Sequence, residues 1–198
     1  MSGYFAAPHR RGVDRARRSG GRKIRRVETS EGDAFALRRG YRCGMILREV
    51  TEADLPILFE HQREPEGQRM ALFPGRDREA FMAHWRDKVL ANPSNAKMAI
   101  VVDGVVVGNV VAWDGDGKRL VGYWLGSAHW GRGIASAALA DFVAHHERTR
   151  PLHAYVAVQN IGSIRVLEKA GFRPVGPPTT DPDGVAELLM HLESPPDP

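Results

Sequence analysis

The chain has 198 residues, of which 42% are hydrophobic and 26% charged, so it is long enough to bury the core of one domain. The longest apolar run, residues 98–113, is interrupted by Asp103-Gly104 and is shorter than the roughly 20 residues of a membrane helix. The N-terminus lacks the apolar segment of a secretory signal, and the single cysteine, Cys43, cannot form an internal disulfide. The composition therefore argues against a membrane-spanning or disulfide-stabilised secreted protein and favours a cytoplasmic one.

The positive charge of the chain is concentrated near its N-terminus. Residues 1–44 contain twelve Lys or Arg against four Asp or Glu, whereas the whole chain carries a net charge of +4, so residues 45–198 carry −4. The segment 1–44 has no sustained apolar period, which indicates a disordered extension. It is either an arm that contacts nucleic acid or a ribosome through charge, or a solvated extension that a start at Met45 would remove. The second interpretation is favoured, because no aromatic residues alternate with the basic run of residues 15–26.

From Met45 onward the sequence predicts a regular series of elements. Those of the first half are a strand over 45–50, a helix from Thr51 to about Gln62, an irregular segment over 63–76, and a helix over 77–91. Thr51 and Asp77 are the expected N-terminal caps of the two helices, because their side chains can accept a hydrogen bond from the first turn. Asn92-Pro93 is expected to end the second helix.

The second half of the chain alternates between strand and helix patterns. The expected order is a strand over 97–102, a strand over 105–113, a strand over 119–127, a helix that follows Gly133 and runs to His146, a strand over 151–158, a helix over 160–170 and a last strand over 185–192. Asp103-Gly104 between two β-branched runs favours a hairpin turn of type I′, and residues 181–184 are expected to form another hairpin tip. Asn160 and Gly171 are the expected caps of the second helix.

The turn before residue 134 has the composition of an anion site. Gly131 and Gly133 lie between a strand and a helix, where unpaired backbone N–H groups and the positive end of the helix dipole meet. A phosphate is the ligand that such a site usually binds. A Walker loop would require Lys after the glycines, and a dinucleotide fold would require a third glycine after the first strand of an alternating chain. Neither condition is met.

Two motifs, in this element order, resemble the GNAT superfamily of N-acetyltransferases over residues 45–192. In the first, Trp130-Gly131-Arg132-Gly133-Ile134-Ala135, Gly133 and Ala135 match the small positions of the family's Q/R-x-x-G-x-G/A loop, while Trp130 replaces the usual Gln or Arg. The second is Asn160-Ile161-Gly162-Ser163 followed by VLEKAGF at residues 166–172. The W-G-x-G-I-A form looks like the branch of ribosomal-protein N-terminal acetyltransferases.

The resemblance implies an α+β fold over residues 45–198, with a mixed, mostly antiparallel sheet of about six or seven strands and about four flanking helices. In that family the sheet splays between its fourth and fifth strands, and acetyl-CoA lies there as the acyl donor. The residues expected to contact it are Leu125, Gly126, Trp130, Gly131, Arg132, Gly133, Ile134, Ala135, Ser136, Asn160 and Ser163. No metal is implied, and no spacing of His or Cys predicts a zinc site.

The implied reaction is direct attack of an amine on the thioester, which needs a polarised carbonyl and a proton for the departing sulfur. A backbone N–H near Leu125 is the expected donor to the carbonyl oxygen. Many family members carry Tyr at the position of Leu167, which is apolar here, so Ser163 is the candidate for the proton. A helix-capping role for Ser163 is an equally good interpretation. Tyr123 and Trp124 either line the acyl pocket or belong to the core, and the core is favoured because aromatic residues of strands are more often buried there.

The acceptor is expected to bind beside the first two helices, where His61, Gln62 and Glu64 are the candidate contacts and a solvated loop is the alternative. No general base is evident, which favours α-amines, because their pKa of about 7.7–8.0 leaves a neutral fraction that a lysine amine lacks. The predicted function is an acetyl-CoA-dependent N-acetyltransferase of a small amine or a protein N-terminus, with a homodimer as an option. The alternative is a non-catalytic acyl-CoA-binding regulatory module, which the missing tyrosine and base would explain.

Overall fold

The computed structural model describes residues 44–181 and 183–193. Apart from Gly44, the predicted extension 1–44 lies outside the described residues. The strands form one sheet in the order β1-β2-β3-β4-β5-β8-β6, and β7 pairs with β8. Their bounds are β1 Met45–Glu49, β2 Ala96–Val102, β3 Val105–Gly115, β4 Lys118–Leu125, β5 Leu152–Ala157, β6 Arg173–Pro174, β7 Thr179–Thr180 and β8 Ala186–Leu192.

The sheet is mixed and mostly antiparallel, as predicted. All neighbouring strands pair antiparallel except β4 and β5, which run parallel. Within the described ranges the sheet has eight strands instead of six or seven. The difference comes from β6 and β7, which each comprise two residues that pair with β8. Segments this short show no alternation, so the sequence pattern does not reveal them.

Five α-helices accompany the sheet in the part of the chain that the structure describes: α2 Leu55–Gln62, α3 Pro65–Ala71, α4 Arg78–His84, α5 Ile134–Asp141 and α6 Ile161–Lys169. Turns of π-helix, Trp85–Leu90 and Phe142–His146, continue α4 and α5. The bounds of the predicted helices are therefore confirmed to within a few residues. None of the described helices combines the length and apolar character needed to cross a membrane.

The helix that the sequence did not predict is α3. It lies where an irregular segment was expected, so the prediction for residues 63–76 was wrong. Pro65 begins α3, because proline at the first helical position needs no acceptor for a missing N–H, and Leu72 with φ of 50° ends it. Gly67 reads as a helix breaker in the sequence, but here it allows close packing. A Cβ at Gly67 would lie 2.8 Å from the Trp124 indole. The glycine therefore reflects a tertiary contact with β4.

Most of the predicted caps and turns are confirmed. Asp77 and Asn160 each accept a hydrogen bond from the backbone N–H three residues later, at 2.8 and 3.1 Å. Gly171 follows α6 with φ of 94°. Asp103 and Gly104 have φ of 52° and 80°, and a type I′ turn requires positive φ at both residues. These features depend on local chemistry, which the sequence displays directly.

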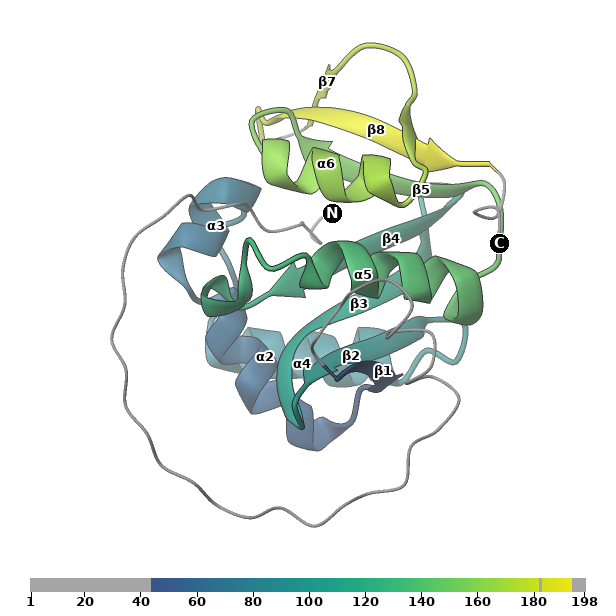
Figure 1. Cartoon of the computed structure of the whole chain (residues 1–198). Helices are drawn as coiled ribbons and strands as arrows, with labels where there is room; N and C mark the ends of the chain where they lie inside the picture. The colour runs from purple at the N-terminus through teal and green to yellow at the C-terminus, as the bar shows by residue number, and fades with distance from the viewer. Residues whose placement is uncertain (1–43, 182, 194–198) are drawn as a thin grey trace.

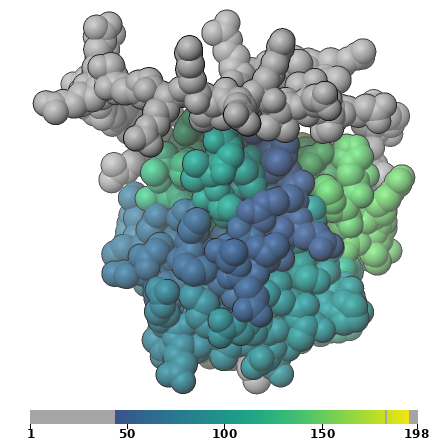
Figure 2. Space-filling view, turned by 90° about the horizontal axis from the view of Figure 1, so that it is seen from below, coloured from purple at the N-terminus to yellow at the C-terminus, as the bar shows by residue number. Residues whose placement is uncertain are grey.

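Helices cover both faces of the sheet. In the view of Figure 1, α5 and α6 lie in front of the sheet, and α2 and α4 lie behind it. Phe142 packs with Val110 and Tyr123 on the first side, while Trp85 packs with Val111 on the second. Neighbouring residues of β3 thus point into two separate cores, as expected for a strand buried on both faces. Seen from below, the blue surface of the first described residues adjoins the teal surface of residues nearer the middle of the chain (Figure 2).

β4 and β5 separate after a short stretch of pairing, which confirms the splay that the resemblance implied. Arg119 is in register with Leu152, and Leu120 with His153. Residues 121–125 of β4 pair with β3 on one side and have no register partner on β5. The edge of β4 that faces β5 is therefore open to hydrogen bonding with a ligand.

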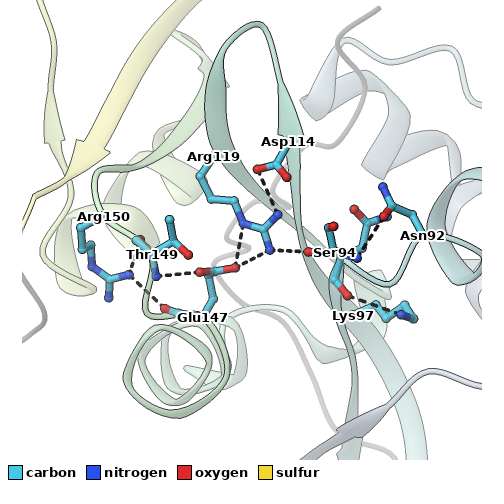
Figure 3. A network of polar contacts seen from close by, with 9 residues as sticks. Asn92, Ser94, Lys97, Asp114, Arg119, Glu147, Thr149 and Arg150 are labelled. Atoms are coloured by element: carbon cyan, nitrogen blue, oxygen red, sulfur yellow. Dashed lines mark hydrogen bonds and ion pairs between the residues drawn. The ribbon is translucent and has the colours of Figure 1, made fainter.

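The separation of β4 and β5 leaves a gap between them, which is closed at the end where the strands still pair. A largely buried polar network fixes this closed end (Figure 3). Nε of Arg119 donates to Glu147 Oε2 at 2.8 Å, and its guanidinium also donates to the Ser94 carbonyl at 2.8 Å. The N–H of Thr149 donates to the other carboxylate oxygen at 2.7 Å. Burial alone would raise the pKa of Glu147, but hydrogen bonds from Thr149 and Arg119 outweigh burial and lower it. The network ties β4 to the segment that leads into β5 and so determines where the strands part.

Candidate active site

The turn before α5 has the backbone conformation that an anion site requires. Gly131 and Gly133 have φ of 74° and 79°, in the left-handed region that favours glycine. Gly133 is the N-cap of α5, and a glycine has no side chain to occupy the amides of the first turn. The amides from Ile134 to Ser136 begin the helix and so have no intrahelical acceptor, and the helix dipole adds positive potential there. This turn can hold a phosphate.

The last residues of β4 direct amide groups into the gap. The N–H of Gly126 donates to the Val107 carbonyl on β3 at 2.9 Å. Because the backbone groups of successive strand residues point to alternate sides, those of Tyr123 and Leu125 point away from β3. The Leu125 carbonyl accepts the Trp130 indole N–H at 2.8 Å, which agrees with this direction. The N–H of Leu125 therefore faces the gap, in place to donate to a ligand oxygen.

Trp130 links these two parts of the site. Its side chain is buried in a cluster with Leu125 and Ile134, and its indole holds the last carbonyl of β4. The residue that replaces the family's usual Gln or Arg thus attaches the glycine turn to the strand. Because its side chain is engaged in this way, only the backbone of Trp130 is available for the predicted contact with a cofactor.

The predicted residues of α6 lie across the gap from β4. Asn160 is buried, and its side chain caps the helix by accepting the Ser163 N–H at 3.1 Å. The Ser163 hydroxyl lies 3.0 Å from the Tyr123 hydroxyl. Burial raises the pKa of Tyr123, so its phenol keeps its proton. The capping role of Asn160 is confirmed, while a catalytic role for Ser163 stays a prediction.

The candidate acceptor residues lie at the end of β4. Glu64 Oε2 accepts the Ser127 N–H at 2.7 Å, and the His61 carbonyl accepts the Trp124 indole N–H at 2.8 Å. The His61 ring packs so closely on Gly126 that a Cβ there would lie 2.7 Å from it. These contacts attach the loop between α2 and α3 to the end of the strand.

The electrostatics of this loop differ from the sequence-based picture of solvated charges. Burial lowers the pKa of His61, so its imidazole is neutral near pH 7. Glu64 is engaged with a backbone amide, which leaves its carboxylate less free for a cation than expected. The Gln62 side chain is buried, 7% exposed, and its Oε1 has no hydrogen-bond partner among the described residues.

A buried acid on β8 was among the residues that the sequence did not reveal. Glu187 of β8 is 3% exposed and stands opposite Ala157 of β5. Burial, together with the nearby carboxylate of Asp181, raises its pKa to about 7. Its only sequence signal is a glutamate at an inward position of the strand VAELLMHL, and the pattern alone does not show which face of that strand is covered.

Several solved structures share the fold. An aminoglycoside acetyltransferase, AAC(6')-Ib, in complex with coenzyme A aligns with a TM-score of 0.63 at 22% identity, covering 76% of this chain and 95% of that one. Spermidine N-acetyltransferase from Vibrio cholerae in complex with CoA and spermine aligns with a TM-score of 0.64 at 14% identity, covering 76% and 95%. A GNAT-family acetyltransferase from Bacillus anthracis gives 0.63 at 16% identity, covering 75% and 94%.

A sequence relative supports the same class. The chain is 42% identical over 59 residues to "Probable N-acetyltransferase YjcK" of Bacillus subtilis (strain 168). This match covers 28% of the present chain, which spans about a third, 33%, of that relative.

The fold is that of the acetyltransferase structures named above. Residues 45–173 match the acetyltransferase (GNAT) domain family, and the chain belongs to this family.

Proposed function

We propose that this protein transfers the acetyl group of acetyl-CoA directly to a primary amine. The observation that carries the proposal is that the Trp130 indole attaches the glycine turn at α5 to Leu125, at the end of the unpaired edge of β4. The amides of the turn suit a pyrophosphate. The backbone groups of Tyr123 and Leu125 suit the amides of pantetheine, which would pair with β4 as an added strand does. The predicted contacts of Gly131, Gly133 and Asn160 with acetyl-CoA belong to this proposal.

The groups at the gap supply two of the needs of the reaction. Acetyl-CoA brings a thioester carbonyl that an amine can attack. The N–H of Leu125, fixed by the strand, donates to the carbonyl oxygen as negative charge develops, and a fixed donor needs no reorganisation. Ser163 is the proposed proton donor to the departing sulfur. The amine nitrogen loses a proton as the amide forms, and that proton balances the one that Ser163 gives to sulfur. Tyr123 stays protonated, because burial raises its pKa, and its phenol holds the Ser163 hydroxyl through their hydrogen bond.

The acceptor would enter where the α2–α3 loop meets the end of β4. A neutral His61 does not repel a cationic amine there, and Glu64 adds a negative charge close by. The fold relatives named above as aminoglycoside and spermidine acetyltransferases favour a small cationic amine as the acceptor. A protein N-terminus, as in the ribosomal-protein branch, is the second acceptor to test.

The test is release of free CoA thiol from acetyl-CoA with kanamycin, spermidine and an N-terminal peptide as acceptors, with the acetylated product identified by mass spectrometry. We expect acceptor-dependent release with at least one amine. Tight binding of acetyl-CoA without release for any acceptor would contradict the proposal and support a non-catalytic acyl-CoA-binding module.

A further inference from the structure

Glu187 is a buried carboxylate that lacks a cationic partner within the described ranges. The residue is 3% exposed, and its Oε1 has no hydrogen-bond partner there. The charged group that acts on it is Asp181, a second carboxylate, whose Oδ1 accepts the N–H groups of Asp183 and Val185. Burying an unpaired carboxylate costs free energy, and a bound cation would remove that cost. The position therefore suits either a bound cation or a carboxyl group that stays protonated.

The strand register places Glu187 beside the open end of the gap. β4 and β5 pair only near Leu120, whereas Glu187 stands opposite Ala157 at the far end of β5. On β8, Leu188 and Met190 pack into the core that includes α6. Because side chains alternate along a strand, Glu187 points to the opposite face. It therefore lies on the side of the sheet away from α6, at the end where β4 and β5 are apart.

The order of the strands separates Glu187 from the reacting atoms. The amine that is acetylated must reach the carbonyl held at the Leu125 N–H, on the edge of β4. Glu187 is on β8, and β5 lies between β8 and the gap. Strands are about 4.8 Å apart, so the carboxylate is at least one strand spacing beyond the gap. A nitrogen bound to Glu187 is therefore not the nitrogen that attacks.

Resting on the proposed function, we propose that Glu187 binds a second cationic nitrogen of the acceptor. The preferred substrates are then diamines or polyamines whose two amino groups are about 5 to 10 Å apart, one to two strand spacings. One amino group is acetylated at the end of β4, and the other remains an ammonium ion paired with the carboxylate. An ammonium group fits because it is a hydrogen-bond donor with a full charge, and charge-assisted hydrogen bonds are the strong ones.

The titratable groups around Glu187 give this recognition a pH dependence. Burial and Asp181 raise the pKa of Glu187 to about 7, so the carboxylate is half ionised near neutrality. On the same face, burial lowers the pKa of His153, and His191 lies beside its ring at 6.3 Å. On α3, which packs near β5, the charges of Glu66 and Arg69 lie 4.0 Å apart. The KM for a diamine is therefore expected to fall as pH rises through about 7, as Glu187 becomes ionised.

The decisive experiment compares cadaverine with n-pentylamine, which has the same chain and a single amino group, in the full-length protein. We expect wild type to favour cadaverine in kcat/KM by about tenfold or more, the usual worth of a hydrogen bond to a charged group. In Glu187→Gln this preference should fall toward unity, mainly through KM for cadaverine. Glu168→Gln, on the exposed side of α6, is the control and should keep the wild-type preference.

The outcomes separate this inference from the function on which it rests. Equal turnover of the two amines by wild type, or an unchanged preference in Glu187→Gln, would overturn the inference and leave the acetyltransferase activity standing. A parallel loss of rate with both amines would show a structural role and would also overturn it. Wild-type protein that turns over neither these amines nor any acceptor of the wider panel would overturn both proposals.

Discussion

The hydroxyl of Tyr123 on β4 lies 3.0 Å from the hydroxyl of Ser163 on α6, and the two residues are 2% and 0% exposed. This contact joins the strand on one side of the gap to the helix on the other. Since each hydroxyl can both donate and accept, the contact can be a structural tie alone, or it can also hold the Ser163 hydroxyl in place as a proton donor. The two roles differ in what removal of each hydroxyl would do.

We expect Tyr123→Phe and Ser163→Ala each to lower the free energy of unfolding by about 1 kcal/mol, because each removes one buried hydrogen bond. If Ser163 serves the departing sulfur, Ser163→Ala should also lower kcat well below that of Tyr123→Phe, with little change in KM for acetyl-CoA. Urea unfolding and steady-state kinetics on both variants measure the two effects. Equal kcat values in the two variants would remove Ser163 from the chemistry and leave it as a tie.

The glycine turn gives a test of the cofactor site. Gly133 has a φ of 79° and is the N-cap residue of α5. Gly133→Asn and Gly133→Asp bring side chains of similar size that tolerate this conformation, so they differ mainly in charge. We expect Asp to weaken acetyl-CoA binding about tenfold or more relative to Asn, because a carboxylate would sit beside the pyrophosphate at a helix terminus. Calorimetric titration measures this, and equal dissociation constants for the two variants would argue against a phosphate at the turn.

The parts of the fold that the sequence predicted are those that local chemistry determines. Asp103-Gly104 adopts the positive φ values of a type I′ turn, and Asn160 caps its helix with its own side chain. The predicted glycine turn between strand and helix is present, with Gly131 and Gly133 at φ of 74° and 79°. Each of these features depends on residues only a few positions apart, so a short window of sequence contains the whole cause.

The parts that were missed depend on contacts between distant segments. Gly67 reads as a breaker, yet it lies inside a helix because the Trp124 indole occupies the space of a Cβ. Glu64 looks like a free surface charge, yet it accepts the N–H of Ser127, 63 residues away. The burial of the Glu187 side chain depends on which face of β8 is covered by other elements. No local pattern contains these facts, because burial and partners are set by the assembled sheet.

The pair Arg119 and Glu147 predicts a stability effect with a defined pH dependence. Their side chains are 10% and 4% exposed. Glu147→Gln should lower the free energy of unfolding by about 3 kcal/mol at pH 7, because it removes the buried counter-charge of a largely buried guanidinium. The pKa of Glu147 is below its ordinary value of 4.5 in the folded protein. The charged pair therefore stabilises the fold above about pH 4.5, and the contribution is lost as pH falls through the lowered pKa.

The matched control for this variant is Asp114→Asn. Asp114 contacts the same guanidinium at 3.2 Å, but its side chain is 68% exposed. We expect a change of no more than about 1 kcal/mol there, as for other surface ion pairs. Urea unfolding from pH 3 to 8 checks both variants. Equal losses of stability in the two variants at pH 7 would contradict the assignment of the stabilisation to the buried partner.

Glu187→Gln should have the opposite effect and raise the free energy of unfolding. The pKa of Glu187 is raised from 4.5 to about 7, so folding favours the protonated carboxyl, which glutamine resembles. Relative to the variant, wild type loses this contribution as pH rises from about 4.5 through 7. At pH 8 the variant should be more stable than wild type by about 3 kcal/mol, and near pH 4 the two should agree. Glu193→Gln, whose side chain is 74% exposed, should show no such divergence. Wild-type and Glu187→Gln stability curves that run parallel from pH 4 to 8 would show that the carboxyl of Glu187 titrates at its ordinary pKa in the folded protein.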